Sequence, residues 1–160
     1  MHLTLLLKQD LQGPGVTEQD VLNATECIMP CFEIVDSRID NWKIAIQDTI
    51  ADNASCGVYV LGQDRISPEG LELDKLEVVV MKNGAELSRG MGSAVQGNPL
   101  TAVAWLANTI GEFGIPLKAG EAILSGSLVP LENAVSGDLF EMIMTGEGIE
   151  PSTVSCRFGD

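Results

Sequence analysis

One acidic side chain in this sequence stands inside an apolar run, where its charge needs a partner. Residues 31–43 read CFEIVDSRIDNWK, in which Glu33 has aromatic and aliphatic neighbours on both sides. An unpaired buried carboxylate is very costly, so Glu33 must find a cation, a set of hydrogen bonds or a raised pKa. From these residues alone, a structural ion pair with Arg38 or Lys43 and a functional role are about equally well supported.

The composition limits which partners the protein can bind. The 160 residues contain 9 Lys plus Arg against 23 Asp plus Glu, a formal net charge of -14. Such a surface repels phosphate backbones and anionic lipids, so nucleic acid and membrane are not expected as partners. Carboxylates are the ligands that hard divalent cations prefer, so a metal site stays open. The length predicts a single domain over residues 1–160, with enough apolar residues for a core.

The cysteines and the first residues indicate a cytoplasmic protein. Cys27, Cys31, Cys56 and Cys156 have no C-x-x-C spacing, and the one histidine is His2, so a zinc site is a poor fit. Buried free thiols are the better interpretation. The opening MHLTLLLK is too short for a signal peptide, and no segment reaches the ~18 to 20 apolar residues of a membrane span.

The elements that must position Glu33 can be read from local signals. Thr17, with Asp20 three residues later, predicts the start of a helix of roughly three turns that ends at Pro30. The run CFEIVDS then predicts a buried strand. Asn98 as N-cap and Pro99 at the first helical position, with Gly114 after the end, predict a long, mostly buried helix.

The rest of the chain is typical of strands and turns. Asn83-Gly84 between two β-rich runs predicts a hairpin, because this pair supplies the positive φ angles of a tight turn. Residues 50–62 are expected to pass from a polar loop into a strand that ends at Gly62. Further strands are expected in residues 119–127, 136–144 and 152–158. Two helices among many strands predict an α+β fold with a curled, mostly antiparallel sheet.

Six motifs in order resemble one known family. They are DLQGPGVT, EIVDSRI, DNAS, AVAWLAN, PLKAGEAILSGSLVP and CRF, and together they span about residues 3–158. The sequence resembles the hydratase and decarboxylase branch of the fumarylacetoacetate hydrolase superfamily, whose members act in meta-cleavage degradation of aromatic compounds. The resemblance implies a mixed β-roll, which agrees with the α+β prediction.

The resemblance also implies a metal site. The family holds Mg²⁺ or Mn²⁺ on three acids, two from a Glu-x-Glu motif and a third at the position of Glu33. It further implies substrate-binding roles for Asn53, Ser55, Gly126 and Ser127. Asp36, Arg38 and Asp52 are expected to brace the site around the metal ligand. A polar turn and a strand-end turn explain the substrate-binding positions nearly as well.

The sequence departs from the family at two points. Counting back from DLQGPG, the second acid of Glu-x-Glu falls at position 2, where this chain has His2, and the first falls before residue 1. The family's catalytic lysine lies in an N-terminal region that this sequence does not include, so no catalytic residue is assigned. The sequence resembles the C-terminal portion of a full enzyme. His2 can in principle ligate a metal, but beside the first residue it is expected to take no part in the site.

The expected activity is a metal-dependent hydration of 2-hydroxypenta-2,4-dienoate (2-oxopent-4-enoate) to 4-hydroxy-2-oxopentanoate, with little activity from this chain alone. One alternative is 4-oxalocrotonate decarboxylase, and another is a non-catalytic fragment or interaction subunit. The expected ligand is a small 2-oxo or 2-enol carboxylic acid. The family also implies a homo-oligomer, and a complex with another enzyme of the pathway is a further expectation.

Overall fold

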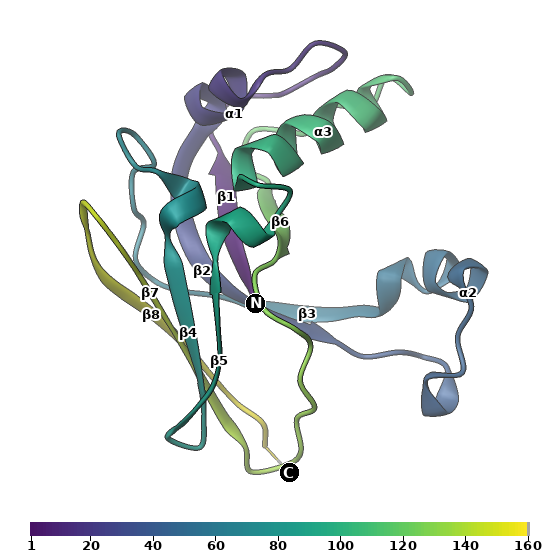
Figure 1. Cartoon of the computed structure of the whole chain (residues 1–160). Coiled ribbons are helices and arrows are strands. Elements are labelled where there is room, and N and C mark those ends of the chain that lie inside the picture. Colours follow the sequence, from purple (N-terminus) through teal and green to yellow (C-terminus); the bar gives the residue numbers. More distant parts are fainter. Residues whose placement is uncertain (160) are drawn as a thin grey trace.

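Two four-stranded antiparallel sheets form the body of the computed structural model, which describes residues 1–159 (Figure 1). The first sheet has the order β3-β2-β1-β6, with bounds β1 His2–Leu7, β2 Thr25–Val35, β3 Cys56–Leu61 and β6 Ala122–Ser127. The second has the order β5-β4-β7-β8, with bounds β4 Glu77–Lys82, β5 Ala85–Met91, β7 Leu139–Gly146 and β8 Ile149–Arg157.

The helices lie at the edges of these sheets. Their bounds are α1 Glu18–Ala24, α2 Ile46–Ala51 and α3 Pro99–Gly111, and single 3₁₀ turns cover Asp40–Trp42, Asn53–Ser55, Leu73–Lys75 and Gly92–Ala94. In Figure 1, α1 and α3 lie together at one end of the sheets, whereas α2 stands apart at the other side. Mixed helices and antiparallel strands confirm the predicted α+β class, although the strands form two sheets instead of one curled sheet.

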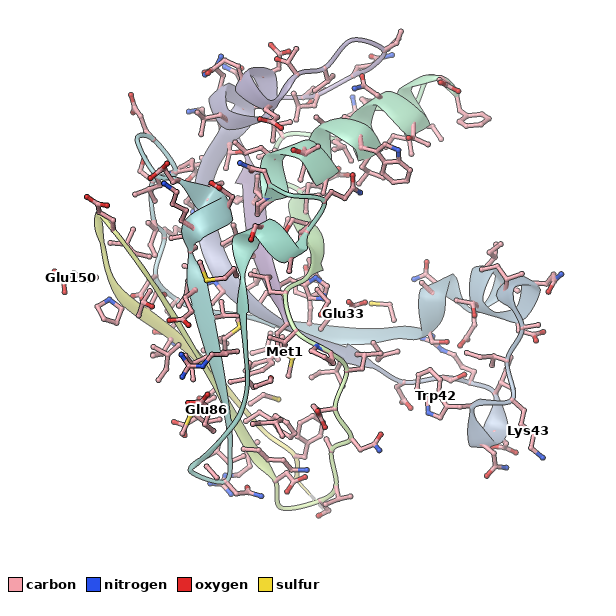
Figure 2. All side chains as sticks on the ribbon, viewed as in Figure 1. Met1, Glu33, Trp42, Lys43, Glu86 and Glu150 are labelled. Carbon is pink, nitrogen blue, oxygen red and sulfur yellow. The ribbon has the colours of Figure 1, made fainter. Side chains whose placement is uncertain are left out.

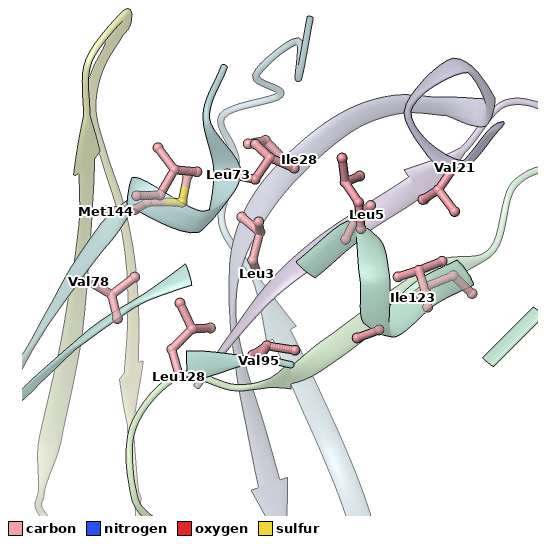
Figure 3. Close-up of a cluster of buried hydrophobic side chains, with 14 of the residues drawn as sticks. Leu3, Leu5, Val21, Ile28, Leu73, Val78, Val95, Ile123, Leu128 and Met144 are labelled. Atoms are coloured by element: carbon pink, nitrogen blue, oxygen red, sulfur yellow. The ribbon is translucent and has the colours of Figure 1, made fainter. Parts of the chain in front are cut away.

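The core fills the space between the two sheets. Leu3 and Leu5 of β1 and Ile28 of β2 are at most 1% exposed, and they belong to the same buried cluster as Val78 of β4 and Met144 of β7 (Figure 3). Each such side chain contributes roughly 1.5–3 kcal/mol when removed from water. Strand β1 is therefore held by core packing and by pairing with β2 and β6 along its two edges.

The strongest local signals gave the correct elements. Asn83 and Gly84 have φ of 53° and 82° and join β4 to β5. The side chain of Asn98 accepts a hydrogen bond from the Leu100 amide, with Pro99 as the first residue of α3. Both predictions are confirmed because turn and cap chemistry depend only on neighbouring residues.

The predicted helix between Thr17 and Pro30 was too long. Thr17 and Asp20 form the expected capping box, but α1 stops at Ala24, and residues from Thr25 onward join β2. Pro30 lies inside that strand opposite Leu3, and its carbonyl accepts the Gly62 amide at 2.8 Å. Pairing with β1 overrides the helical spacing of the apolar residues.

Residues 36–55 form an arm that extends away from the sheets and carries α2 (Figure 1). The helix was not predicted, although its signal is present: the carboxylate of Asp48 accepts the Ala45 amide at the helix start. The arm exposes apolar side chains, among them Trp42 at 54%. Trp105 and Met91 are also exposed, so none of these three large apolar residues belongs to the core.

None of the described helices is both long and apolar enough to cross a membrane. The four cysteines are free thiols: Cys27 and Cys31 are buried, as expected, while Cys56 and Cys156 are half-buried.

Candidate active site

Strand β1 brings Glu33 together with His2. His2 lies opposite Cys31 in β2, and Glu33 follows two residues later on the same face, so the two side chains are diagonal neighbours. His2 Nε2 lies 2.9 Å from Glu33 Oε2, and the Glu33 side chain is 23% exposed. Glu33 thus pairs with His2 and not with Arg38 or Lys43, and the expectation that His2 takes no part was wrong.

The His2 imidazole is neutral at neutral pH. Burial and, to a smaller extent, the nearby Met1 ammonium lower the pKa of His2 to about 4, although the Glu33 carboxylate acts to raise it. A neutral imidazole carries one N–H, and donation from Nε2 to Glu33 leaves Nδ1 as an acceptor. Nδ1 is buried and forms no hydrogen bond with the residues that the structure describes. The pair therefore orients the carboxylate without neutralising it.

Two thiols lie near the same carboxylate. Burial raises the pKa of the Cys56 thiol, and the charge of Glu33 raises it further. Burial also raises the pKa of Cys31. Both cysteines therefore stay protonated, and neither brings a thiolate to the site.

The segment Gly126–Ser127 lies across β1 from Glu33. His2 pairs with Ser127 in β6 as well as with Cys31 in β2, so β1 stands between the two positions. Gly126 has φ of 136°, and a Cβ there would come within 2.9 Å of Val95 Cγ1, so a glycine is needed. Ser127 Oγ donates to the Val129 carbonyl at 2.7 Å. The predicted carboxylate-binding segment is thus near Glu33, although its binding role stays a prediction.

The base of the arm is organised by Asp52. Its carboxylate accepts hydrogen bonds from Ser55 Oγ at 2.8 Å and the Arg38 amide at 3.2 Å, and Arg38 Nη1 lies 3.4 Å from Oδ1. Although burial acts to raise it, these donors lower the pKa of Asp52. Arg38 also donates to the Cys56 carbonyl at 3.0 Å. Arg38 therefore fixes the arm to the start of β3 and does not bond Glu33.

The other predicted site residues belong to the arm and form no hydrogen bond or ion pair with His2 or Glu33. Asn53 is exposed and Ser55 is buried, and both have positive φ, as does Ala54 between them. Neither Asn53 nor Ser55 is among the described residues that line the main cavity, whereas Asp36 is. The substrate-binding roles of Asn53 and Ser55 stay predictions.

A cavity of about 610 Å³ opens beside Glu33. Its lining comes from the end of β2, the arm, the loop before β7 and the end of β8: Met1, Phe32, Glu33, Ile34, Val35, Asp36, Trp42, Leu131, Glu132, Asn133, Ala134, Phe140, Cys156 and Phe158. Figure 2 shows Met1 beside Glu33 where the ribbons meet, with Trp42 on the arm. No local signal in the chain indicated that the loop and β8 would contribute, because their positions depend on how distant strands pack.

The described residues do not by themselves fit a Mg²⁺ or Mn²⁺ ion. Mg²⁺ demands near-octahedral oxygen coordination, whereas the centre of this site offers one carboxylate and one imidazole. Within residues 1–159, no group of three or more His, Cys, Asp or Glu side chains is placed to hold a metal. A complete metal site would need ligands other than these.

Similarity to known proteins extends along nearly the whole chain. The family described as fumarylacetoacetate (FAA) hydrolase C-terminal matches residues 1–155. The chain is 61% identical over 147 residues to the 2-hydroxyhexa-2,4-dienoate hydratase of Comamonas testosteroni, covering 92% of this chain and 56% of that protein. It is 59% identical over 114 residues to a 2-hydroxypent-2,4-dienoate hydratase of Pseudomonas putida, covering 71% of this chain and 51% of that protein.

Solved structures show the same fold. The 4-oxalocrotonate decarboxylase from Pseudomonas putida G7, complexed with magnesium and adipate, superposes with a TM-score of 0.89 at 35% identity. The match covers 98% of this chain and 58% of that one. The chain therefore spans little more than half the length of the proteins it matches.

Proposed function

The chain belongs to the fumarylacetoacetate hydrolase C-terminal family, and from this premise we propose that it serves the hydration of a 2-hydroxyalka-2,4-dienoate. The observation that carries the proposal is the oriented Glu33 carboxylate at the edge of a 610 Å³ cavity. Identities of 61% and 59% to two dienoate hydratases support the hydratase assignment over the decarboxylase, to which the identity is 35%.

The proposed reaction adds one water molecule. The 2-hydroxyl loses its proton as the enol becomes a ketone, C5 gains a proton, the hydroxide of water bonds to C4, and C3 takes up the last proton. For the five-carbon substrate, 2-hydroxypenta-2,4-dienoate, the product is 4-hydroxy-2-oxopentanoate. The step fits the degradation of aromatic compounds by the meta-cleavage route, in which we place the protein.

We assign each residue near the cavity a part in binding. Glu33 contributes a charged oxygen, held in place by His2, and we propose that it ligates a divalent cation, Mg²⁺ or Mn²⁺, together with ligands other than those described. The backbone at Gly126 and Ser127 receives the substrate carboxylate. The decarboxylase structure that contains magnesium supports the metal. The position of Gly126 and Ser127 across β1 from Glu33 supports the carboxylate site.

Reconstitution tests this function. The 160-residue chain is compared with a fusion that carries the N-terminal part of the Comamonas testosteroni hydratase ahead of Leu3. Both are supplied with Mg²⁺ or Mn²⁺, and loss of the dienol absorbance is followed. We expect negligible hydration by the chain alone, because loss of one electrostatic contributor can cost ~10²- to 10³-fold in rate. The fusion should restore it.

The control for this experiment is Glu33→Ala in both proteins. If the unfused chain hydrates the dienol at an ordinary enzymatic rate, and Glu33→Ala abolishes that rate, the chain assembles its site by a route that the proposal omits. If the fusion folds but hydrates no dienoate, the assignment as a hydratase fails.

We further propose that the chain self-associates and works in the cytoplasm. The exposed apolar residues of the arm, Trp42, Ile46 and Ile50, with Val58 and Tyr59 of β3, support an interface between copies. Four free thiols support a reducing compartment. Sedimentation at micromolar concentration checks the first point, and a clean monomer would count against it.

A further inference from the structure

The arm concentrates backbone strain in a short part of the chain. Five of the seven non-glycine residues with positive φ among residues 1–159 lie in it: Asn41, Trp42, Asn53, Ala54 and Ser55. The left-handed conformation suits glycine and is tolerated by asparagine, but it is disfavoured roughly 5- to 30-fold for each other residue. Such residues persist only where surrounding contacts hold them, and they are typical of functional segments.

Residues 53–55 form a left-handed turn where the arm returns to the sheet. Their φ angles are 54°, 57° and 54°. Asn53 and Ala54 are exposed, so packing of their side chains does not explain the turn, whereas Ser55 is only 1% exposed. The Ser55 amide donates to the Asp52 carbonyl at 2.9 Å, and the Ser55 carbonyl accepts the Asp36 amide at 2.8 Å. The turn therefore joins the two ends of the arm.

The Asp52 carboxylate holds this turn. It accepts hydrogen bonds from Ser55 Oγ at 2.8 Å, the Arg38 amide at 3.2 Å and Ser37 Oγ at 3.5 Å. The Asp52 side chain is only 9% exposed. The Arg38 guanidinium also donates to the carbonyls of Asp52 and Cys56, at 3.1 Å and 3.0 Å. The first and last residues of the arm are thus tied through one buried carboxylate.

Little else holds the arm in place. Within residues 36–55, Ser55 is the one residue classed as buried, and α2 has none. Trp42, Ile46 and Ile50 are 54%, 66% and 73% exposed. Segments with few buried contacts open locally at a small cost in free energy. The arm can therefore move as a unit while the two sheets stay folded.

We infer that Asp52 is a positioning residue: its bonds to Arg38 and Ser55 hold the strained turn, and the turn fixes the arm against the ends of β2 and β3. The arm carries Trp42, which lines the cavity together with Glu33 (Figure 2). Without Asp52 the turn relaxes to ordinary φ angles and the arm becomes mobile. The position of the arm does not depend on the reaction, whereas its effect on turnover rests on the function proposed above.

Hydrogen exchange of the 160-residue chain measures the arm separately from catalysis. The Asp36 amide is the reporter, because it donates to the Ser55 carbonyl and not to Asp52 itself. Asp52→Ala should speed its exchange by roughly tenfold or more, since hydrogen bonds to a charged group are lost. Asp40→Ala removes an exposed acid of the same arm and should leave the rate within about twofold. An unchanged rate in Asp52→Ala would overturn the inference.

Ala54 tests the strain itself. Ala54→Gly suits the left-handed turn and should slow exchange of the Asp36 amide by about fivefold or more. Ala51→Gly, the matched change at the end of α2, should not slow it, because glycine weakens a helix. Ala54→Gly keeps every bond of Asp52, so faster or unchanged exchange in this variant overturns the inference even if Asp52→Ala does not fold. All variants are compared at one protein concentration, because association through the arm also slows exchange.

Trp42 reports where the arm lies. The sequence has two tryptophans, so Trp105→Phe leaves Trp42 as the one indole. In that background Asp52→Ala should shift the emission to longer wavelength and increase quenching by acrylamide, because Trp42 leaves the cavity wall. Asp52→Asn keeps an oxygen for Ser55 and should keep the original spectrum. Identical spectra for all three proteins, with folding checked by circular dichroism, would show that Asp52 does not position the arm.

Kinetics of the fused enzyme separate this inference from the proposed function. Asp52→Ala should raise KM by roughly tenfold and leave kcat within about threefold, because the arm lines the cavity and does not supply the reacting group. If the arm responds to Asp52→Ala as described but no dienoate is hydrated, the hydratase proposal alone fails. If dienoates are hydrated and neither exchange nor KM responds, the inference about Asp52 alone fails.

Discussion

Asp138 accepts hydrogen bonds from three different residues, whereas the ion-pair partner of Glu33 in the described chain is His2 alone. Lys82 Nζ, Asn83 Nδ2 and the Val135 amide lie 2.8–2.9 Å from the oxygens of Asp138. Hydrogen bonds from Lys82, and then from Asn83 and Val135, lower the pKa of Asp138 to about 2. The oxygens of this carboxylate are occupied by bonds that join the β4–β5 hairpin to the start of β7.

Glu33 is held differently. Its ion-pair partner is a neutral imidazole, so the carboxylate is oriented but its charge is not cancelled. Glu33 also lines a cavity, whereas Asp138 lies where the β4–β5 hairpin meets β7. A carboxylate whose oxygens already accept from three donors has little capacity left for a ligand. Glu33, whose ion-pair partner is a neutral imidazole, can still bind a cation or substrate. The contrast separates an acid that holds the fold from an acid that is available for chemistry.

The largest expected effect comes from exchanging each acid for its amide in the fused enzyme. Glu33→Gln should lower kcat/KM by ~10²- to 10³-fold, because it removes a charge at the reacting end. Asp138→Asn should leave kcat/KM per folded molecule within roughly threefold, since its bonds are structural. Steady-state rates normalised to folded protein check this, and similar losses from both variants would break the comparison.

Acid should destabilise the two regions in separate pH ranges. Folding lowers the pKa of His2 from 6.5 to about 4. Between these two pH values His2 is protonated in the unfolded chain but not in the folded chain, so the free energy of unfolding falls as the pH drops from 6.5 towards 4. The loss is on the order of 3 kcal/mol in total. The pKa of Asp138 falls from 3.8 to about 2, so its contribution is kept above pH 3.8 and lost as the pH falls through 2.

Urea unfolding at pH 7, 6, 5 and 4 measures the first of these ranges. His2→Gln removes the titrating group and should flatten the pH dependence between 6.5 and 4, while Asp138→Asn should not change that slope. If the free energy of unfolding of His2→Gln depends on pH between 6.5 and 4 as steeply as that of the unchanged chain, His2 is not the group that titrates.

Thermal stability should respond in the opposite order to activity. Asp138→Asn disrupts a network of three donors and should lower Tm by roughly 5–10 °C. Glu33→Gln keeps the shape of the side chain and a hydrogen-bonding group beside His2, so a change below about 2 °C is expected. Calorimetric scans of both variants beside Glu150→Gln, an exposed control, check the ranking.

The smallest expected effect is that of Mg²⁺ on the 160-residue chain. With one carboxylate at the centre of the site, a dissociation constant of about 1 mM or weaker is expected. At 1 mM Mg²⁺ the free energy of unfolding should then rise by no more than about 0.4 kcal/mol. Submicromolar binding by calorimetry that disappears in Glu33→Gln would show that His2 or a neighbouring subunit completes the site.

The parts of the fold that the sequence predicted are those set by near neighbours. The Asn83-Gly84 turn and the Asn98 cap act within four residues, and the apolar run around Glu33 marked a strand without help from elsewhere. The end of α1 was missed because it is decided by β1, which captures residues from Thr25 onward. The local spacing of apolar residues fitted a helix, but pairing with β1 placed the residues from Thr25 onward in a strand.

The candidate site divides in the same way. Glu33 was identified because a charge in an apolar run is visible in the sequence. Its contact with His2 was not predicted, because it depends on the register between β1 and β2. The arm residue Arg38 was expected beside Glu33 from its position in the chain, but it bonds Asp52 instead. Register and the path of the arm are properties of the whole fold.

The position of β1 also decides when the site can form. Its residue His2 pairs with Ser127 of β6, so two positions 125 residues apart in sequence meet at the same strand. Closing so long a loop has a high entropic cost, and folds dominated by such contacts fold slowly. During synthesis, a ribosome must release residues up to β6 before His2 is held between its two neighbours. Until then β1 can pair with β2, but the Gly126–Ser127 segment is still missing from the site beside Glu33.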